Sequence, residues 1–534
     1  MPTSRISISG LFSGAGLALL ALVMLAPLLY FPFARDHGMY MVVAETMSRG
    51  GMPYADAWDL KTPGIFFVFR TALALFGRVM WGVRVLELVS LAATALLLAR
   101  TGRRLFPELP AAGPVGAAWF LLFCGHNLNY WHTAQAESFL MLPLALGIHF
   151  AIGALQAGEK RRGLARAVMA GLCTGIVFVF KFPNILPLAC CLPLLLPAQE
   201  KGKGLPRLPL LAWFAAGALL APALAGAWFA LGGAWGPMVE TLFVFAPRYA
   251  GITASSGLLA HAVVVFGGFF LPGAGLTLVK WLALVGLAVC RQSPRISGRY
   301  VLPLWFLLSL LVIFIQGKFF LYHYLPLYMP LGLLAGTTAA TLASAISARV
   351  KGGEQARRRS GAILLATLLA LPFLLDLGTI RHHWRDARAG IEHYRDGTDF
   401  SLAADLEMAD YLKQNTGPDD PVFIWGYETL VYFLAERRPA SRFITHQPLA
   451  SRWQMPGWRE ELMTDLERQR PPRILVMRRD AMPAVTGSTL DSAALLAEYP
   501  ELQRFIQRHY RLETTIEDFM VYGPLPGGAF DDQH

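Results

Sequence analysis

Long apolar stretches recur along the chain as far as residue 377 and then stop. A helix that crosses a bilayer needs about 20 mainly apolar residues, and this part of the chain supplies many such stretches. We expect the first stretch to be a retained helix, because no small-residue cleavage signal follows it. The pattern predicts eleven membrane-spanning helices, over residues 11–31, 82–99, 113–127, 137–155, 167–181, 183–197, 209–231, 260–289, 300–316, 322–345 and 361–377.

The last part of the chain, 379–534, alternates amphipathic segments with short apolar runs, and such an alternation favours a small α/β layer. Helical periodicity predicts helices at 402–414, 428–436, 458–470 and 493–509. The short runs predict strands at 422–425, 442–445, 474–477, 512–516 and 519–522. The sequence therefore predicts an α-helical polytopic membrane domain, 1–378, followed by a soluble α/β domain, 379–534.

Composition and charge support this division. The chain is 55% hydrophobic and 16% charged, whereas an ordinary soluble domain carries roughly 25% charged residues. The net charge of +11 comes from basic clusters in alternate loops, at 100–104, 160–166, 201–207, 291–299 and 349–359. The positive-inside rule places those loops in the cytoplasm, so we expect an inner (plasma) membrane protein with no nucleic-acid partner.

The same rule places the first outer loop, 32–81, and the C-terminal domain on the extracytoplasmic side. Within this loop, residues 39–49 are predicted to form an amphipathic helix on the membrane surface. Residues 62–76 are predicted to form a re-entrant or interfacial segment. All five cysteines lie in apolar stretches, which argues against a disulfide framework and against a CxxC zinc site.

The first outer loop also holds the strongest candidate chemistry, a carboxylate at Asp36 and a cation at Lys61. A carboxylate accepts the proton of an attacking hydroxyl, and a cation stabilises charge on a leaving phosphate. The structural alternatives are an N-terminal helix cap for Asp36 and an interface anchor for Lys61. Asp56 and Asp59 are most simply solvated turn residues.

Further candidates lie in other predicted outer segments. Glu137 ends a polar and aromatic loop, where it is either a second carboxylate of a binding wall or a first-turn residue of the next helix. Arg248, Lys318 and His323 are candidate phosphate ligands, and interfacial anchoring explains each of them equally well when it is taken alone. Lys181 lies at the outer end of an apolar stretch, where an ionisable group is a functional hypothesis by default.

The first outer loop resembles that of the GT-C superfamily of glycosyltransferases. It is most similar to the family 39-type enzymes related to protein O-mannosyltransferases and to the aminoarabinose transferase of lipid A. The matching residues are Asp36, Tyr40, Gly51, Pro53, Tyr54, Asp56, Lys61, Pro63, Gly64, Phe76, Gly77 and Arg84. Weaker similarity continues at Gly171-x-x-x-Gly175 with Lys181, at 319–326, and at 409–412, 420–426 and 432–434.

The resemblance implies a transferase that moves a sugar from a polyprenyl-phosphate donor to a lipid, glycan or protein of the cell envelope, with inversion at the anomeric carbon. It implies that Asp36 is the catalytic base. It assigns the donor phosphate to Lys61, Arg248, Lys318 and His323, and substrate contacts to Tyr40, Tyr54, Asp56, Asp59 and Glu137.

The chain departs from several relatives after Asp36, where their second acid is replaced by His37. This departure leaves open a second acid and a divalent metal ion, and no other cofactor is implied. A transporter or lipid flippase is the main alternative, although its ionisable groups typically lie near the bilayer midplane. A receptor or scaffold is a third alternative, and it would not need the Asp36–Lys61 arrangement.

Overall fold

The computed structural model describes residues 14–195, 207–251, 263, 273–389 and 402–526. Two compact units make up the chain, and each combines several sequence segments. Unit 1 comprises Met1–Tyr30, Val83–Gly226 and Ser256–Arg388, and unit 2 comprises Phe31–Gly82, Ala227–Ser255 and Ala389–His534. The first outer loop thus belongs to the same unit as the C-terminal segment, while the division into a 1–378 and a 379–534 domain stays a prediction.

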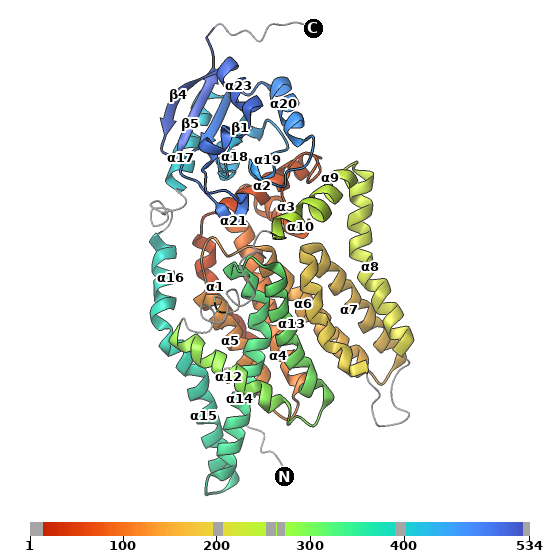
Figure 1. The fold of residues 1–534 in the computed structure, drawn as a ribbon. Helices are drawn as coiled ribbons and strands as arrows, with labels where there is room; N and C mark the ends of the chain where they lie inside the picture. The colour runs from red at the N-terminus through yellow and green to blue at the C-terminus, as the bar shows by residue number, and fades with distance from the viewer. Residues whose placement is uncertain (1–13, 196–206, 252–262, 264–272, 390–401, 527–534) are drawn as a thin grey trace. The chain divides into compact units, whose positions relative to one another are not determined.

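Unit 1 is built from helices. Its α-helices are α1 (Gly14–Leu25), α4 (Trp81–Leu105), α5 (Ala112–His126), α6 (Ala136–Leu155), α7 (Lys160–Lys181), α8 (Arg207–Leu231), α12 (Ala274–Cys290), α13 (Leu302–Gln316), α14 (Tyr328–Arg349), α15 (Glu354–Leu375) and α16 (Leu377–Ala389). Tighter or wider turns form η1 (Ala26–Tyr30), η2 (Phe182–Leu195), η5 (Ser297–Val301) and η6 (Leu321–Leu327). Figure 1 shows α14 and α15 as an antiparallel pair.

Among the described residues, seven helices are long and apolar enough to cross a membrane, or eight if α1–η1 and the bent α2 form one span. Three further helices, α3 (Gly64–Phe76), α5 and α12, are apolar but shorter. The polytopic helical fold is as predicted, while the count of eleven spans stays a prediction. Most of 260–272, within the predicted span 260–289, lies outside the described residues.

Close backbone approach joins α7 to α8. A Cβ atom on Gly175 would lie 2.5 Å from the carbonyl oxygen of Ala218, and one on Gly171 would meet the carbonyl of Phe214. Small residues on one helix face let two backbones pack closely in a membrane. Close packing matters there because lipid tails are as apolar as the side chains, so the hydrophobic effect does not drive helices together. The Gly171-x-x-x-Gly175 motif therefore forms a close helix–helix contact with α8, and Lys181 lies at the end of the same helix, α7.

Unit 2 contains a five-stranded sheet and short helices. The strands are β1 (Pro421–Trp425), β2 (Arg438–Pro439), β3 (Arg473–Met477), β4 (Tyr510–Ile516) and β5 (Phe519–Pro524). The helical elements are α2 (Arg35–Ser48), α3 (Gly64–Phe76), α9 (Trp235–Val239), η3 (Glu240–Phe245), α10 (Ala246–Gly251), α17 (Leu402–Asn415), α18 (Leu430–Ala435), α19 (Gln447–Ala450), α20 (Trp458–Gln469), α21 (Pro483–Thr486), α22 (Ser492–Leu496) and α23 (Pro500–His509).

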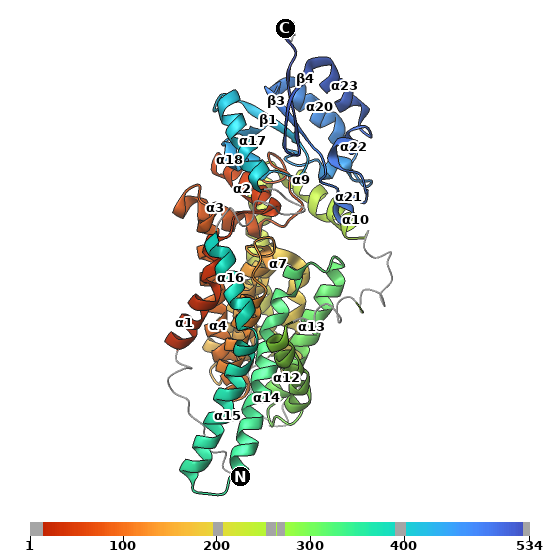
Figure 2. The same ribbon diagram turned by 90° about the vertical axis from the view of Figure 1, so that its left-hand side faces the viewer.

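The sheet has the order β2-β1-β3-β5-β4, with β1 parallel to β2 and β3, and with β5 antiparallel to β3 and β4. Helices α17 and α18 lie on one side of it and α20 and α23 on the other (Figure 2). Cover on both faces explains why all five residues of β1 are buried.

Two predictions for this segment are wrong. Residues 442–445 form no strand, because the chain leaves the sheet after the short β2 and packs its side chains into the core. The helix predicted at 493–509 is two helices, since Pro500 begins α23 and lacks the N–H group that would continue α22.

The first outer loop contributes to the core of this sheet domain. Trp58 is fully buried, and its ring meets those of Phe245 and Trp458 edge to face, at centroid distances of 5.2 and 5.8 Å. The backbone N–H of Trp58 donates to the Arg442 carbonyl at 2.7 Å, and the Arg442 guanidinium donates to the Tyr54 carbonyl at 2.8 Å. Loop and domain therefore share one hydrophobic core, which holds the loop in one conformation.

Helix α2 is buried in protein nearly all round. Arg35 donates to Glu428 at 2.5 Å, and Gly38 lies against Leu430 of α18, where an added Cβ would come within 2.6 Å of the backbone nitrogen. The prediction of an amphipathic helix on the membrane surface is wrong, because α2 packs its polar groups against protein partners rather than against water.

We expect Gly38→Ala to lower the stability of unit 2, since the new methyl group clashes with backbone that cannot rotate away. Overpacking of this kind costs about 1–3 kcal/mol, so the unfolding midpoint of the purified protein should fall in a thermal scan. Gly236→Ala in α9 is the matched control, because its Cβ meets nothing within 4 Å. Equal midpoints for the two variants would contradict the tight α2–α18 contact.

Candidate active site

Asp36 and Lys61 come together in unit 2. Asp36 lies in the first turn of α2, and Lys61 lies just before Pro63, the residue that caps α3. The Lys61 Nζ is 3.8 Å from Asp36 Oδ2, and the two side chains are 21% and 31% exposed. Tyr40, one turn along α2, donates its hydroxyl to Asp36 Oδ2 at 3.4 Å. The sequence-predicted acid, cation and tyrosine thus form one group, in which the acid and the cation are partly exposed and the tyrosine is buried.

The helix-cap alternative for Asp36 is wrong. The N-cap residue of α2 is Ala34, and Asp36 lies inside the helix, in its first turn. His37 supplies that contact instead, because the Ala34 N–H donates to His37 Nδ1 at 2.9 Å. Asp36 retains only the weaker advantage of a carboxylate in a first helical turn, which leaves its oxygens directed to Lys61 and Tyr40.

His37 is fully buried, with its ring stacked on that of Phe69 at a centroid distance of 6.2 Å. Nδ1 accepts the Ala34 N–H and so carries no proton. Within the described residues, no group of three or more His, Cys, Asp and Glu side chains is arranged to hold a metal ion. In this structure His37 orients the start of α2, and through it the neighbouring Asp36.

Two of the predicted substrate residues hold Lys61 in place. Tyr54, fully buried, donates its hydroxyl to the Lys61 carbonyl at 2.7 Å, and the Lys61 N–H donates to Asp59 Oδ1 at 2.8 Å. Asp56 is exposed and accepts the Met52 N–H at 2.7 Å, which closes the turn around Pro53. The solvated-turn interpretation therefore fits Asp56 and fails for Asp59, which is only 2% exposed.

The buried carboxyl group of Asp59 has a raised pKa. Burial raises its pKa to about 7, although the charge and the backbone N–H of Lys61 act in the opposite direction. Its second oxygen, Oδ2, is buried and has no hydrogen-bond partner in the described part of the chain. A carboxyl group with this pKa exchanges between its ionised and protonated forms near neutral pH, and its protonated form presents an O–H to the neighbouring space.

Two tyrosines near the pair escaped the sequence interpretation. Burial raises the pKa of Tyr249 to about 12, and the charges of Lys61 and Asp36 both act on its hydroxyl. Burial likewise raises the pKa of Tyr427, with a contribution from Tyr249 and a smaller one from Asp36. The Tyr427 hydroxyl is buried without a hydrogen-bond partner among the described residues. Neither tyrosine lies in a local motif that would have drawn attention to it.

Arg248 precedes Tyr249 in α10, but its side chain is exposed and its guanidinium approaches Met455 Sδ at 3.7 Å. The structure describes no contact between Arg248 and Asp36 or Lys61, so a role for Arg248 in phosphate binding stays a prediction. The neighbouring Tyr249 is the residue of this short helix that experiences the charges of the pair.

Unit 1 holds a second ionic group. Glu137, in the first turn of α6, is buried and paired with Lys181 at the end of α7. His323 Nε2 lies 3.9 Å from the same carboxylate, and Lys181 Nζ lies 5.7 Å from the centre of the Tyr322 ring. An ion pair among apolar helices needs such partners to offset desolvation. The first-turn position and the charged contact of Glu137 therefore coexist.

Lys318 follows Gly317 between α13 and η6, outside any helix. Burial lowers the pKa of Lys318 to about 8. At neutral pH this lysine is still mainly charged and remains suited to an anionic group, so its assignment to the donor phosphate stays a prediction.

Residues 60–233 match the family described as dolichyl-phosphate-mannose-protein mannosyltransferase. No curated protein matches the chain in sequence. A crystal structure of ArnT from Cupriavidus metallidurans bound to undecaprenyl phosphate is 15% identical, with a TM-score of 0.60 over 96% of this chain and 97% of ArnT. The apo structure of the same protein is also 15% identical, with a TM-score of 0.57 over the same shares of the two chains.

These comparisons confirm the predicted resemblance to the GT-C superfamily. They also confirm the fold class, a polytopic helical protein that continues into a small C-terminal α/β domain. The family match begins at residue 60, so it includes Lys61 and Glu137 and ends before Arg248.

The raised pKa of Asp59 predicts a pH-dependent stability. An acid whose pKa is higher in the folded state than its ordinary value of 3.8 contributes most to stability at low pH, and that contribution is lost as pH rises from about 4 to about 7. Asp59→Asn cannot ionise. We therefore expect the unfolding midpoint of the variant, relative to wild type, to be higher at pH 8 than at pH 5. The same difference at both pH values would show that Asp59 is ionised throughout.

Proposed function

We propose that this GT-C-fold protein is a membrane glycosyltransferase that moves a sugar from a polyprenyl-phosphate donor to a hydroxyl of an envelope lipid, glycan or protein. The main support is the Asp36–Lys61 ion pair. The Tyr40 hydroxyl donates to its carboxylate, and the charges of both residues act on the hydroxyl of Tyr249. The family match and the shared fold support a transferase that uses a lipid carrier. The undecaprenyl phosphate bound to ArnT supports the class of the donor.

Asp36 acts as the general base. Its carboxylate takes the proton of the acceptor hydroxyl as the oxygen attacks the anomeric carbon, an effect worth about 10²–10⁴-fold for a positioned base. The new bond forms between that oxygen and the anomeric carbon, while the bond from this carbon to the donor phosphate breaks. The electron pair leaves with the polyprenyl phosphate, and a single displacement inverts the anomeric centre.

Lys61 stabilises the phosphate as it leaves. In the structure its ammonium group is paired with Asp36 at 3.8 Å, which is too close for a sugar to lie between them. The singly charged phosphodiester of a bound donor gives Lys61 a second anionic acceptor and so releases the carboxylate for the incoming hydroxyl. Lys61 then stabilises the second negative charge that develops on the phosphate as the sugar leaves. The resting ion pair thus keeps the base unavailable until the donor is bound.

Asp59 and Tyr54 act through Lys61, because both bind its backbone and leave its ammonium group to the ligand. The buried Tyr427 hydroxyl and Asp59 Oδ2 are suited to hydroxyl groups of a sugar. The family resemblance further suggests that Lys318 and His323 bind the donor phosphate and that Glu137 contacts a substrate.

The reaction takes place on the extracytoplasmic face of the inner membrane. Basic loops at 100–104, 160–166 and 349–359 mark the opposite, cytoplasmic side. A lipid-linked donor fits this face, because the carrier brings an activated sugar to a compartment without nucleotide sugars.

Asp36→Asn tests the base. The variant keeps the size of the side chain, so we expect normal insertion into the membrane and a loss of transfer of 10²-fold or more. The measurement compares intact masses of envelope glycolipids and glycoproteins from cells that carry wild type, the variant, or Asp419→Asn. Asp419 is exposed and remote in sequence from the loop, so cells that carry Asp419→Asn should show the same masses as cells that carry wild type. Full transfer by the Asp36 variant would remove this residue from the mechanism.

Tyr249→Phe tests the neighbouring hydroxyl. One lost hydrogen bond to a reacting group is worth about 1.4 kcal/mol, so we expect roughly tenfold slower transfer and an unchanged unfolding midpoint. Tyr411→Phe, which removes an exposed hydroxyl bonded to Glu513, serves as the control. Equal rates for the two variants would exclude Tyr249 from the reaction.

A further inference from the structure

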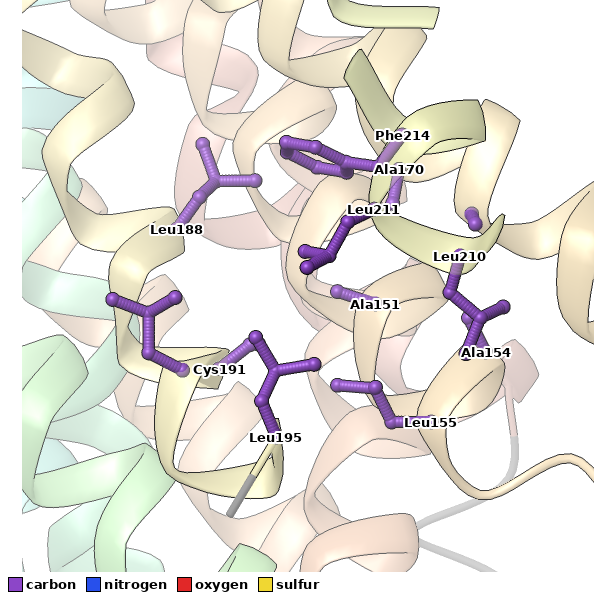
Figure 3. A pocket seen from close by; sticks show the side chains of 12 residues that line it. Ala151, Ala154, Leu155, Ala170, Leu188, Cys191, Leu195, Leu210, Leu211 and Phe214 are labelled. Atoms are coloured by element: carbon purple, nitrogen blue, oxygen red, sulfur yellow. The ribbon is translucent and has the colours of Figure 1, made fainter. Parts of the chain in front are cut away.

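A cavity of about 100 Å³ lies in unit 1, among the ends of α6, α7, η2 and α8. Its lining is apolar and includes Ala154, Ala167, Ala170, Leu188, Leu211 and Phe214. Figure 3 shows Ala154, Ala170, Leu188 and Phe214, which come from α6, α7, η2 and α8, around one space. An apolar cavity of comparable size stays dry and takes up small hydrocarbon groups. The interior of this cavity therefore suits a few methylene groups.

The surroundings of the cavity indicate lipid. Leu192, Leu208 and Leu211 beside it are 58%, 78% and 44% exposed, an arrangement that is costly in water and ordinary against acyl chains. The helices η2 and α8 that carry these leucines belong to segments long enough to cross the membrane. The cavity thus opens among lipid-facing side chains.

Two arginines lie beside the cavity. Arg104, at the end of α4, donates to the His149 carbonyl, and Arg166, in the second turn of α7, donates to the Gly153 carbonyl, each at 2.9 Å. Both converge on Gly153, where an added Cβ would lie 2.6 Å from Arg104 Nη1 and 3.3 Å from Arg166 Cδ. Gly153 directly precedes the cavity residue Ala154.

Arg104 and Arg166 together carry two positive charges. No carboxylate within the described residues forms an ion pair with Arg104 or Arg166, whereas the neighbouring Arg162 is paired with Glu159. Each guanidinium has five N–H donors and uses one of them in the bond to a carbonyl described above. Two like charges held together in this way favour an anion that bridges them.

We propose that the cavity and the arginine pair form a binding site for an anionic phospholipid. One acyl chain enters the cavity, and the phosphate lies between Arg104 and Arg166. The positive-inside rule puts this end of α4 and α7 in the cytoplasmic leaflet, where anionic headgroups attract juxtamembrane basic residues. The site lies in unit 1 and uses none of the residues of the proposed transfer reaction. Only the preference for a phospholipid over the polyprenyl-phosphate carrier rests on that proposed function.

A phospholipid is favoured over the polyprenyl-phosphate carrier. The basic loops flank this site, and the carrier's phosphate is required on the opposite face for transfer. A cavity of this size takes a short part of one chain, and the rest of a diacyl lipid covers the exposed leucines beside it.

Native mass spectrometry of the purified full-length protein tests the site. Wild type, the Arg104→Gln/Arg166→Gln double variant and the Lys160→Gln/Arg161→Gln control are titrated with phosphatidylglycerol, phosphatidylcholine and undecaprenyl phosphate. The control removes the same charge from exposed positions at the start of α7. We expect wild type and control to retain phosphatidylglycerol over phosphatidylcholine, and the double variant to bind phosphatidylglycerol at least tenfold more weakly.

A second variant, Leu211→Phe, fills the cavity from a partly exposed position and leaves both arginines unchanged. It should also weaken phosphatidylglycerol retention, and it replaces the double variant if that protein does not fold. Equal retention of the two phospholipids by wild type would overturn the proposal, as would equal binding by the double variant and the control. An arginine-dependent preference for undecaprenyl phosphate would assign the site to the carrier instead.

Discussion

A buried guanidinium must be paired, and this requirement sets the geometry of the proposed active site. Arg35 is 6% exposed and donates to Glu428, which lies 393 residues further along the chain. To break such a pair costs about 3–5 kcal/mol, because the remaining charge has neither water nor a partner. Since Asp36 is the next residue, this contact fixes the first turn of α2 and with it the direction of the candidate base.

The same region contains more acid than base. Burial raises the pKa of Glu428, and burial together with the charge of Glu428 raises that of Asp405, whose oxygens have no partner among the described residues. Burial and the negative charge of Glu428 therefore both favour the protonated form of Asp405. The loop is thus held by the Arg35–Glu428 ion pair and by shared core packing around Trp58.

Positioning groups and reacting groups are separated in the first outer loop. Tyr54 and Asp59 bind the backbone of Lys61, and His37 caps α2. In the proposed reaction, none of the three therefore has to move when Lys61 exchanges Asp36 for the donor phosphate. In unit 1 the same principle holds for Glu137, which is satisfied by Lys181 and lies close to His323. The charges of this group therefore have partners, whereas no carboxylate among the described residues forms an ion pair with Arg104 or Arg166, the residues of the proposed phospholipid site.

The sequence by itself determined the elements that depend on local periodicity. These are the apolar stretches, the strands near 421–425 and 473–477, and the placement of Asp36 and Lys61 in one loop. It misplaced α2, because amphipathicity cannot tell a membrane surface from a protein surface, and it misjudged 442–445, because an apolar run serves equally as strand or core loop. Only the tertiary structure decided that Asp36 meets Lys61 and that Tyr249 and Tyr427 lie near them. The physical reason is that burial and charge pairing act between segments hundreds of residues apart, and no local pattern records which segments will meet.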